Sequence, residues 1–573
     1  MYLNTYIRIK NNLSKDNFFH FNLFILFSII AMILEMIGIG LIIPIINIFT
    51  QDQIFFPKIE FLNNLELNKY PKKNLIILSL LCLIVVYLFK TIFLTYVSYK
   101  QTKFITDINK SVSERLFVNY LNRSYEFFLN KNSSELIRNI NDISNFCVLI
   151  RSVLMFLTEI TILVGISLLL IIYEPLGSIV TLLVISIIGI LFSNNIKKKA
   201  EFWGEERRDA DGYKQKIMQE SFRLIKEIKI SNLNKYFISK FVSSNNTSAS
   251  NQFKHEFVLS LPRYWFELIA IFGFTILILV LTYVSHADDN IITTLGLFAA
   301  ATFRLLPSVI RIINNIQQIH FSLPVLNNLS QAFDLEKKVK RNNIDLSTKL
   351  IMKNDLILEN ISFKYQNSNN IVLDNINLKI KIGSIMGIKG PTGVGKTTLV
   401  NIILGLLKPT SGKVLVDGVE IHENLQSWQE IIGYVPQNIV LTDDSLINNI
   451  ALGVEKNQIN KNQVLNCIKD SQLDSFMSSI QKGINTKVGE LGSRLSGGQT
   501  QRIGIARSIY NNPQVLILDE FTSALDINTE EKIINEISNY RKTKTIIMIS
   551  HKLSTLSKCD KVYELTKEGF KLL

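Results

Sequence analysis

Charged residues and cysteines are both scarce in this chain of 573 residues. Asp, Glu, Lys and Arg make up 19% of it, whereas a typical soluble protein has about 25%. The four cysteines are scattered and form neither a C-x-x-C pair nor a metal-ligand spacing. Neither a disulfide framework nor a zinc site is supported. Internal repeats and low-complexity tracts are also lacking, so no part of the chain is duplicated.

Apolar residues are abundant instead, at 47%, and they gather in long runs before residue 320. A membrane-spanning helix needs about 20 mainly apolar residues. The first run is too long for the core of a signal peptide and lacks a small-residue cleavage site. Six runs satisfy the requirement: Phe21–Phe49, Leu75–Tyr99, Val153–Tyr173, Leu176–Ser193, Phe257–Val284 and Ile291–Ile313. We therefore predict an all-α transmembrane domain of six helices over residues 1–335.

Lys and Arg are distributed unevenly between the segments that join these runs. Lys100–Ile150 and Asn194–Glu256 are strongly basic, whereas Ser285–Asn290 has no Lys or Arg. Because cytoplasmic loops carry the positive charge, we expect both basic segments and both termini in the cytoplasm. Gln51–Lys73 fits this orientation less well, since it contains four lysines. The same bias explains the formal charge of +14, so a nucleic-acid partner is not indicated.

The two basic segments have helical periodicity rather than the composition of linkers. We expect the membrane helices to continue through them into the cytoplasm; solvated helices with no coupling role are the alternative. A third segment, on the outer side, has a weak amphipathic pattern at Ile59, Leu62 and Leu65. This pattern predicts either a short helix on the outer membrane face or an ordinary loop.

The second domain begins after a charged run, Leu335–Arg341. Residues 336–353 are predicted to be a linker, and residues 354–573 an α/β domain. The stretch G-P-T-G-V-G-K-T-T, Gly390 to Thr398, matches the pattern G-x-x-x-x-G-K-[ST]. An apolar strand, Ser384–Lys389, precedes it, and an apolar helix, Thr398–Leu407, follows it. This context is that of a P-loop, whose backbone amides and lysine bind phosphate oxygens.

Further motifs follow the P-loop. Y-V-P-Q ends at Gln437, L-S-G-G-Q spans Leu495–Gln499, an apolar strand ends at Asp519 and Glu520, and His551 follows another apolar run. In this order they resemble the motifs of the ATP-binding cassette (ABC) ATPases, and the resemblance covers the whole second domain. The segment before the L-S-G-G-Q motif is similar to that of ABC exporters. One departure from the family pattern is Phe521, where exporters usually have a small residue.

The resemblance implies ATP and Mg²⁺ as cofactors and ATP hydrolysis as the activity. Glu520 would polarise the attacking water, His551 would contact the γ-phosphate, and Lys396 and Gln437 would complete the catalytic set. Mg²⁺ would lie near Thr397, Gln437 and Asp519. The implied ATP contacts are the adenine-stacking Tyr365, the P-loop and the L-S-G-G-Q motif: Gly390, Pro391, Thr392, Gly393, Val394, Gly395, Lys396, Thr397, Thr398, Ser496, Gly497, Gly498 and Gln499.

The resemblance also implies how two chains would cooperate. In ABC exporters, short transverse helices of the cytoplasmic loops dock on the ATPase, and Asn132–Glu135 and Ser221–Phe222 lie near the corresponding places. In this family, Ser496 and Gly498 would serve the ATP site of the opposite subunit. A chain with one cassette cannot complete a site alone, so a dimer is implied, with a two-fold homodimer as the default.

Four cationic side chains lie inside the predicted spans: Lys90, Arg263, Arg304 and Arg311. Charges within the membrane are costly and are functional hypotheses by default. The two arginines of the last span share one face of the helix with other polar residues, so we expect this face to line a cavity. Pairing within the protein is the alternative, and the acids available for it are Glu35, Glu159 and Glu267.

Two short stretches, Pro262–Glu267 and Ala301–Ser308, resemble bacterial ABC flippases for lipid-linked oligosaccharides of protein glycosylation. The resemblance implies that the intramembrane arginines hold a pyrophosphate headgroup, because the planar guanidinium suits phosphate oxygens. We therefore predict a multi-pass protein of the bacterial inner membrane that moves an amphipathic, anionic glycolipid outward. An exporter of another lipid, a peptide or drugs shares every cassette motif and is the alternative.

Overall fold

The structure, a computed structural model, describes residues 15–50, 71–173, 175–284, 291–338, 350–366, 368, 370–541, 543–566 and 569–573. The chain divides into two compact units. The first comprises Met1–Arg123 and Asn130–Lys340, and the second comprises Ser124–Leu129 and Arg341–Leu573. The division after Lys340 falls inside the linker predicted at residues 336–353.

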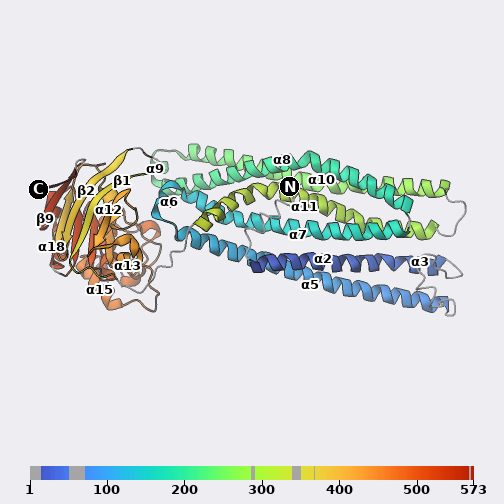
Figure 1. The fold of residues 1–573 in the computed structure, drawn as a ribbon, viewed down its shortest axis with the longest axis horizontal. Helices are drawn as coiled ribbons and strands as arrows, with labels where there is room; N and C mark the ends of the chain where they lie inside the picture. The colour runs from blue at the N-terminus through green and yellow to red at the C-terminus, as the bar shows by residue number, and fades with distance from the viewer. Residues whose placement is uncertain are drawn as a thin grey trace. The chain divides into compact units, whose positions relative to one another are not determined.

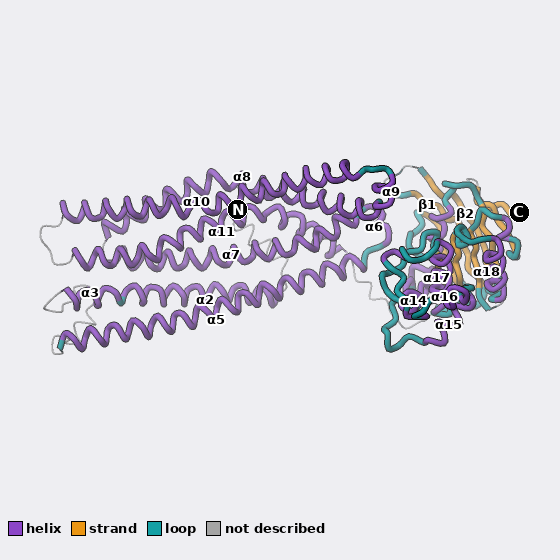
Figure 2. Tube along the Cα trace, turned by 180° about the vertical axis from the view of Figure 1, so that it is seen from behind, coloured by secondary structure: helices purple, strands orange, loops and turns teal. Residues whose placement is uncertain are grey.

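Long helices build the first unit, and they run alongside one another in both views (Figures 1 and 2). In chain order they are α2 (Lys15–Gly40), α3 (Ile42–Thr50), α5 (Lys72–Leu121), α7 (Ser133–Tyr173), α8 (Pro175–Arg223), α10 (Asn234–Val284) and α11 (Ile291–Lys338). Two short helices interrupt this series: α6 (Tyr125–Asn130) and α9 (Ile225–Ile230). They lie beside the stretches Asn132–Glu135 and Ser221–Phe222, which belong to the start of α7 and the end of α8.

All six expected spans fall in helices. Within the described residues, three helical segments are long and apolar enough to cross a membrane: Asn17–Ile46, Lys72–Leu121 and Ser133–Tyr173. The other expected spans lie in α8, α10 and α11. The first span is not the single helix that its apolar run predicts, because α2 ends at Gly40 and α3 begins at Ile42. Pro44 explains the break, since its ring crowds the carbonyl of Gly40 and it has no N–H to donate.

Helices α5 and α8 continue well beyond the apolar runs, as the periodicity of the two basic segments predicts. A buried ion pair joins the extension of α8 to the first half of α7: Arg208 Nε donates to Asp142 Oδ2 at 2.7 Å. Asn139 lies on the same face of α7 and accepts from the same guanidinium at 3.4 Å. Buried charge that is paired and hydrogen-bonded in this way fixes the relative register of α7 and α8.

Apolar side chains face outward along the first half of α5, where Leu78, Val85 and Ile92 are each more than half exposed. An apolar surface of this size suits contact with lipid. An internal apolar cluster joins α2, α3, α7 and α11. The amphipathic helix predicted at Ile59, Leu62 and Leu65 lies outside the described residues.

Two sheets form the framework of the second unit. One has the order β2-β1-β4-β5 and is antiparallel; the other has the order β10-β9-β3-β8-β7-β6, and its strands from β9 to β6 are parallel. The strands are β1 (Asp355–Lys364), β2 (Ile371–Lys381), β3 (Ile385–Lys389), β4 (Ser411–Val416), β5 (Val419–Glu420), β6 (Ile432–Val435), β7 (Val515–Asp519), β8 (Thr545–Ile549), β9 (Lys561–Thr566) and β10 (Gly569–Leu572).

Helices surround the parallel sheet, whose strands β7 and β8 are completely buried. A sheet covered on both faces has apolar strands without alternation, which is why these runs could be recognised in the sequence. The helices are α12 (Lys396–Ile403), α13 (Leu425–Glu430), α14 (Leu446–Ile450), α15 (Lys461–Asp470), α16 (Asp474–Ser479), α17 (Gly497–Tyr510), α18 (Ile527–Asn539) and α19 (Leu553–Leu556). The predicted α/β class of this unit is confirmed.

Candidate functional site

Four neighbouring strands end at one edge of the parallel sheet. β3, β8, β7 and β6 lie side by side in that order. The P-loop follows β3, His551 follows β8, Asp519 and Glu520 end β7, and Gln437 follows β6. Ligands of open α/β sheets bind beyond the carboxyl ends of the strands. The fold therefore gathers motifs that are far apart in the sequence.

The P-loop makes a tight turn between β3 and α12. Gly393 and Gly395 have φ angles of +82° and +107°, a region that residues with a side chain rarely adopt. A Cβ at Gly390 would lie 2.8 Å from the backbone oxygen of Leu565, so this position also excludes a side chain. The loop ends at the N-terminus of α12, where unpaired amides attract an anion.

Lys396 reaches back over this loop. Its Nζ donates to the carbonyl oxygens of Gly390, at 2.7 Å, and Pro391, at 3.1 Å. Burial lowers the pKa of Lys396, while the charges of Glu520 and Asp519 act in the opposite direction. The ammonium group thus sits at the mouth of the loop, where it can exchange carbonyl oxygens for phosphate oxygens.

Glu520 lies in a strained backbone conformation, with φ at +46°. Its Oε2 accepts from Gln437 Nε2 at 2.7 Å, and its Oε1 lies 3.0 Å from His551 Nε2. The same ring nitrogen lies 3.1 Å from Lys396 Nζ. One nitrogen cannot donate to the carboxylate and accept from the ammonium at once, so the protonation of His551 decides which contact is a hydrogen bond. The structure therefore brings together all four predicted catalytic side chains.

Asp519 is the most buried carboxylate at this edge, with 5% of its surface exposed. Burial and the neighbouring Glu520 raise the pKa of Asp519 to about 6, although Lys396 opposes this shift. A divalent cation would offset the cost of burying this charge. Thr397 contributes an exposed hydroxyl, and Gln437 an amide oxygen, which are ligand types that Mg²⁺ accepts. The side chains therefore fit the implied cation.

Tyr365 directly follows β1 and lies beside the P-loop helix. Its hydroxyl is 3.0 Å from Thr398 Oγ1, and its ring meets Phe363 edge-on with centroids 5.0 Å apart. The ring is partly buried and packs against the core of the unit. It is held close to the P-loop, in keeping with the expected contact to a nucleobase.

The L-S-G-G-Q motif begins helix α17. Ser496 is the N-cap: its Oγ accepts from the backbone N–H of Gln499 at 3.2 Å, and Gln499 Oε1 accepts from the N–H of Ser496 at 2.9 Å. A Cβ at Gly498 would lie only 3.1 Å from the backbone oxygen of Ala524. The capping box explains Ser and Gln at this spacing, a signal that was available in the sequence.

Two residues support the site in ways that the motifs do not show. Gln501 connects the start of α17 to the loop after Glu520, donating to Ser523 Oγ at 2.7 Å and accepting from the N–H of Ala524 at 2.9 Å. Phe521, which departs from the family pattern, is completely buried in the core that includes Ile533 and Leu556. It is a packing residue, and the larger side chain is accommodated without displacing the carboxylates from the strand end.

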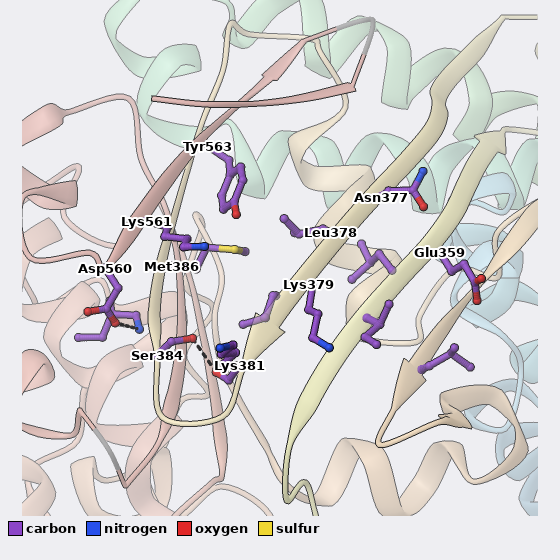
Figure 3. A pocket seen from close by; sticks show the side chains of 15 residues that line it. Glu359, Asn377, Leu378, Lys379, Lys381, Ser384, Met386, Asp560, Lys561 and Tyr563 are labelled. Atoms are coloured by element: carbon purple, nitrogen blue, oxygen red, sulfur yellow. Dashed lines mark hydrogen bonds between the residues drawn. The ribbon is translucent and has the colours of Figure 1, made fainter.

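A separate cleft of about 730 Å³ lies between the two sheets (Figure 3). Its lining comes mainly from β1, β2, β3 and β9, with one residue from β4; Leu378 and Met386 lie on opposite sides and Tyr563 at one end. None of the predicted nucleotide-site residues lines it. It lies by the start of β3, whereas the P-loop follows the end of that strand, so the cleft is not the nucleotide site.

The intramembrane cations of α5 and α11 are paired with two acids. Lys90 Nζ and Arg304 Nε each lie 2.8 Å from Glu35 oxygens. Arg311 Nη1 lies 3.1 Å from Glu159 Oε1, and Arg304 Nη1 lies 3.9 Å from Glu159 Oε2. The sequence left two alternatives for these cations, a cavity-lining face and pairing with acids. The contacts show that Lys90, Arg304 and Arg311 are paired with acids.

Arg263 is separate from this group. Its Nε donates to Glu267 Oε1 at 3.2 Å, one turn further along α10. Both side chains are at least half exposed. The structure therefore does not bring Arg263 together with the other three cations within the described contacts of this chain.

Two protein-family models match the chain. A model described as "ABC transporter" matches residues 373–523, and one described as "ABC transporter transmembrane region" matches residues 21–305. The first contains the P-loop, the L-S-G-G-Q motif and the two carboxylates, and the second contains most of the long helices. The chain belongs to the ABC transporter family. Its second unit is an ABC ATPase domain, and its first is the transmembrane region of an ABC transporter.

A solved structure shares the fold of this ABC transporter over nearly its whole length. That structure, described as a bacterial Atm1-family ABC exporter with ATP bound, has a TM-score of 0.77 and 20% sequence identity. The match covers 98% of this chain and 95% of the other. The predicted fold class, a helical transmembrane domain followed by an ABC ATPase domain, is confirmed as the ABC exporter fold.

Curated relatives match over shorter stretches. The ATP-dependent lipid A-core flippase of Ralstonia nicotianae is 35% identical over 37% of this chain and 36% of the relative. The alpha-hemolysin translocation ATP-binding protein of Proteus vulgaris is 39% identical, over 37% of this chain and 30% of that protein. ABC transporter B family member 14 of Arabidopsis thaliana is 35% identical, over 43% of this chain and 20% of that protein. The matches thus span little more than a third of each relative, or less.

Proposed function

We propose that two copies of this ABC transporter form a homodimeric flippase driven by ATP hydrolysis. Its substrate is an amphipathic lipid with an anionic headgroup, a lipid-linked oligosaccharide carrying pyrophosphate. The lipid moves from the cytoplasmic to the outer side of the bacterial inner membrane, and the ATPase domain faces the cytoplasm. The observation that carries the ATP-driven part is the convergence of the P-loop, Asp519, Glu520 and His551 at one sheet edge.

The proposed roles follow from this geometry. Lys396 and the P-loop amides hold the phosphates. Thr397, Asp519 and Gln437 would hold Mg²⁺, which would supply positive charge beside the phosphate oxygens. Glu520 accepts a proton from the attacking water. Its two oxygens face Gln437 and His551, which orient the carboxylate at the end of the strand.

The remaining ATP contacts are proposed from both chains of the dimer. Tyr365 stacks on adenine, and Ser496, Gly498 and Gln499 act on the ATP of the partner. Ser496 and the P-loop lie at the N-termini of two different helices, α17 and α12. Each such terminus donates to phosphate, so two termini from two chains enclose one nucleotide.

The intramembrane cations support an anionic headgroup. Lys90, Arg304 and Arg311 stand against two acids, Glu35 and Glu159, so the group as a whole has one positive charge in excess when all five are ionised. Arg263 adds a further guanidinium on α10; its exposed partner Glu267 balances its charge, but the pair leaves the guanidinium accessible. A neutral substrate gives no reason to keep such charges within a membrane.

A second candidate function is export of another lipid, a peptide or drugs. One relative's name describes a lipid A-core flippase and another's describes hemolysin translocation, so the similarity does not single out one substrate. The lipid candidates fit the excess positive charge in the membrane region, which the ATPase similarity does not address.

Reconstitution tests this proposal. Purified protein in vesicles is expected to flip a fluorescent polyprenyl-diphosphate oligosaccharide when ATP and Mg²⁺ are supplied, and not without ATP. Glu520→Gln is expected to lower ATP hydrolysis by about 10²-fold or more, and flipping with it, while ATP binding is kept. Glu531→Gln, an exposed acid of the same domain, is the matched control. Flipping of peptides or drugs but not of the glycolipid would replace the substrate assignment.

A further inference from the structure

The five intramembrane charges form one connected set drawn from four helices. Glu35 of α2 lies between Lys90 of α5 and Arg304 of α11, and each cation is 2.8 Å from its own oxygen of this carboxylate. Glu159 of α7 faces Arg311 at 3.1 Å and Arg304 at 3.9 Å. The two carboxylates therefore differ in how many of their oxygens accept a hydrogen bond from a cation.

Glu35 is buried, and both of its carboxylate oxygens have a hydrogen-bond partner. Only 3% of its side chain is exposed, and both oxygens accept a hydrogen bond from a cation. Lys90 and Arg304 are themselves mostly buried, at 12% and 20%. Removing either cation from Glu35 would leave a buried carboxylate short of its counterion, which is strongly unfavourable. Glu35 is thus a permanent counterion that holds α2, α5 and α11 together.

Glu159 is incompletely satisfied. It is buried, and its Oε2 has no hydrogen-bond partner among the described residues, with Arg304 as far as 3.9 Å away. Its main partner, Arg311, is 51% exposed and is the most accessible member of the set. Arg311 also donates from Nε to the carbonyl of Pro307 at 3.3 Å. Among the described contacts its Nη2 has no protein partner, so one side of the guanidinium is open.

We propose that Glu159 is a positioning residue that acts as an exchangeable counterion of Arg311. It holds the guanidinium in the resting chain and gives it up when a phosphate-type anion of the substrate arrives. Arg311 then contacts the anion, whereas Lys90 and Arg304 stay on Glu35. This inference rests on the proposed anionic substrate and narrows the four cations of that proposal to one exchangeable contact.

The chemistry favours exchange at Arg311 over the other cations. A carboxylate and a phosphate oxygen compete for the same planar fork, so the pair with Glu159 is an internal rival of the substrate. A diphosphate carries more charge than one carboxylate and presents more acceptor oxygens, which allows it to displace Glu159 and use Nη2 as well. Neutralising Glu159 should therefore strengthen anion binding.

A double-mutant cycle on the full-length protein in detergent tests the exchange. The probe is a polyprenyl diphosphate, and its apparent Kd is measured by equilibrium titration at two salt concentrations. We expect Glu159→Gln to lower the apparent Kd by about tenfold, the scale of one interaction between charges when one partner is screened by water. Arg311→Gln is expected to raise it about tenfold and to weaken its salt dependence, with partial rescue in Arg311→Lys. In the double variant, Glu159→Gln is expected to have no further effect.

Glu35→Gln is the matched control, because it makes the same acid-to-amide change in the same set. It is expected to lower the melting temperature without increasing anion affinity. If Glu159→Gln also lowers the melting temperature and leaves the Kd unchanged, Glu159 is a structural counterion and the inference is overturned. The same holds if Glu159→Gln acts equally in the Arg311→Gln background.

Dodecyl phosphate, a simple anionic amphiphile, separates this inference from the substrate assignment. If the protein binds dodecyl phosphate with the cycle intact but does not bind the polyprenyl diphosphate, the exchange stands and the glycolipid assignment fails. If polyprenyl diphosphate binds and the cycle shows no coupling between Glu159 and Arg311, the exchange is overturned and the glycolipid assignment stands. If neither amphiphile binds the unmodified protein, both are overturned. Inorganic pyrophosphate shows whether the headgroup alone suffices.

Discussion

Glu530 secures the segment that carries His551. Its Oε2 accepts from Lys552 Nζ at 2.8 Å, and its Oε1 accepts from Thr555 Oγ1 at 2.5 Å. Burial raises the pKa of Glu530, but the bonds from Lys552 and Thr555 outweigh burial, so its pKa lies below the ordinary value of 4.5. Because Lys552 directly follows His551, this carboxylate helps to fix the histidine that faces the P-loop.

Replacing Glu530 by Gln is expected to lower the free energy of unfolding by about 1–3 kcal/mol at pH 7, because a buried site loses its charged acceptor. Since the folded pKa is depressed, the unfolded state takes up the proton first as the pH falls. The advantage of the unmodified protein is therefore present above pH 4.5 and shrinks as the pH drops through the folded pKa. Thermal melts at pH 7 and pH 4 measure it.

The exposed Glu531 is the control for this change. Glu531→Gln is expected to shift neither melt. An equal loss of stability in Glu530→Gln at both pH values would show that shape rather than charge is what Glu530 contributes.

The roles of residues in chemical motifs could be predicted from the sequence. The roles of residues that depend on tertiary packing could not. The P-loop glycines and the pair Asp519–Glu520 were recognisable because their residue types and strand–loop context are required for phosphate binding. The pairing of Arg304 with Glu35 joins residues that are 269 positions apart, and no local pattern encodes it. Phe521 departed from the expected small residue, and the sequence could not show that the core has room for it.

At the scale of elements, helices α8 and α11 approach closely at Gly204. A Cβ at this glycine would lie 2.1 Å from the backbone oxygen of Phe321. Backbone cannot give way as a flexible side chain can. The absence of a side chain at Gly204 thus sets the distance between two helices of the transmembrane region.

Gly204→Ala is expected to destabilise the protein by about 1–3 kcal/mol or more, through overpacking. Gly189→Ala on the same helix is the control, because among the described side chains its Cβ would meet only that of Ile313, at 3.9 Å. There the better helix propensity of alanine makes the change neutral or stabilising. Melting temperatures in detergent compare the two; equal melting temperatures would mean that α8 and α11 do not pack this closely.

Helices and strands with a regular apolar pattern could be predicted from the sequence, and those without one could not. The strands β3, β7 and β8 are buried on both faces and appear as continuous apolar runs, so their positions were recovered closely. The break between α2 and α3 was missed because a run that is apolar throughout gives no periodic signal, although Pro44 indicates it in hindsight. The sequence indicated short transverse helices near Asn132–Glu135 and Ser221–Phe222, and α6 and α9 lie beside these stretches. Their bounds were not predicted, since amphipathic signals are weak over six residues.

The whole chain carries one P-loop and one L-S-G-G-Q motif, so the proposed dimer can be tested by complementation. Lys396→Ala and Ser496→Asp are each expected to be inactive alone. In a mixed dimer, one site combines both changes and the other has neither. Co-expression is therefore expected to restore about a quarter of the normal ATPase rate, since half of the randomly assorted dimers carry one intact site of two.

Separately purified proteins that are mixed without subunit exchange are the control and are expected to stay inactive. No recovery in co-expressed, co-purified dimers would argue that each chain completes its own site, or that one intact site cannot turn over. Trapping of ATP in the co-purified dimers separates these two explanations, because an intact but slow site still traps nucleotide.

The hydroxyl of Ser496 already closes the first turn of α17 by accepting from an amide, yet it retains a hydrogen and a second lone pair. The two tasks are chemically separable. Aspartate or asparagine at this position keeps the acceptor but removes the hydroxyl donor, alanine removes both, and threonine keeps both. Loss of function in an alanine variant consequently cannot be attributed to a missing phosphate contact alone, because the helix end would fray at the same time. Only the series of substitutions, followed by amide exchange at Gln499, distinguishes a weakened ligand contact from an unravelled helix terminus.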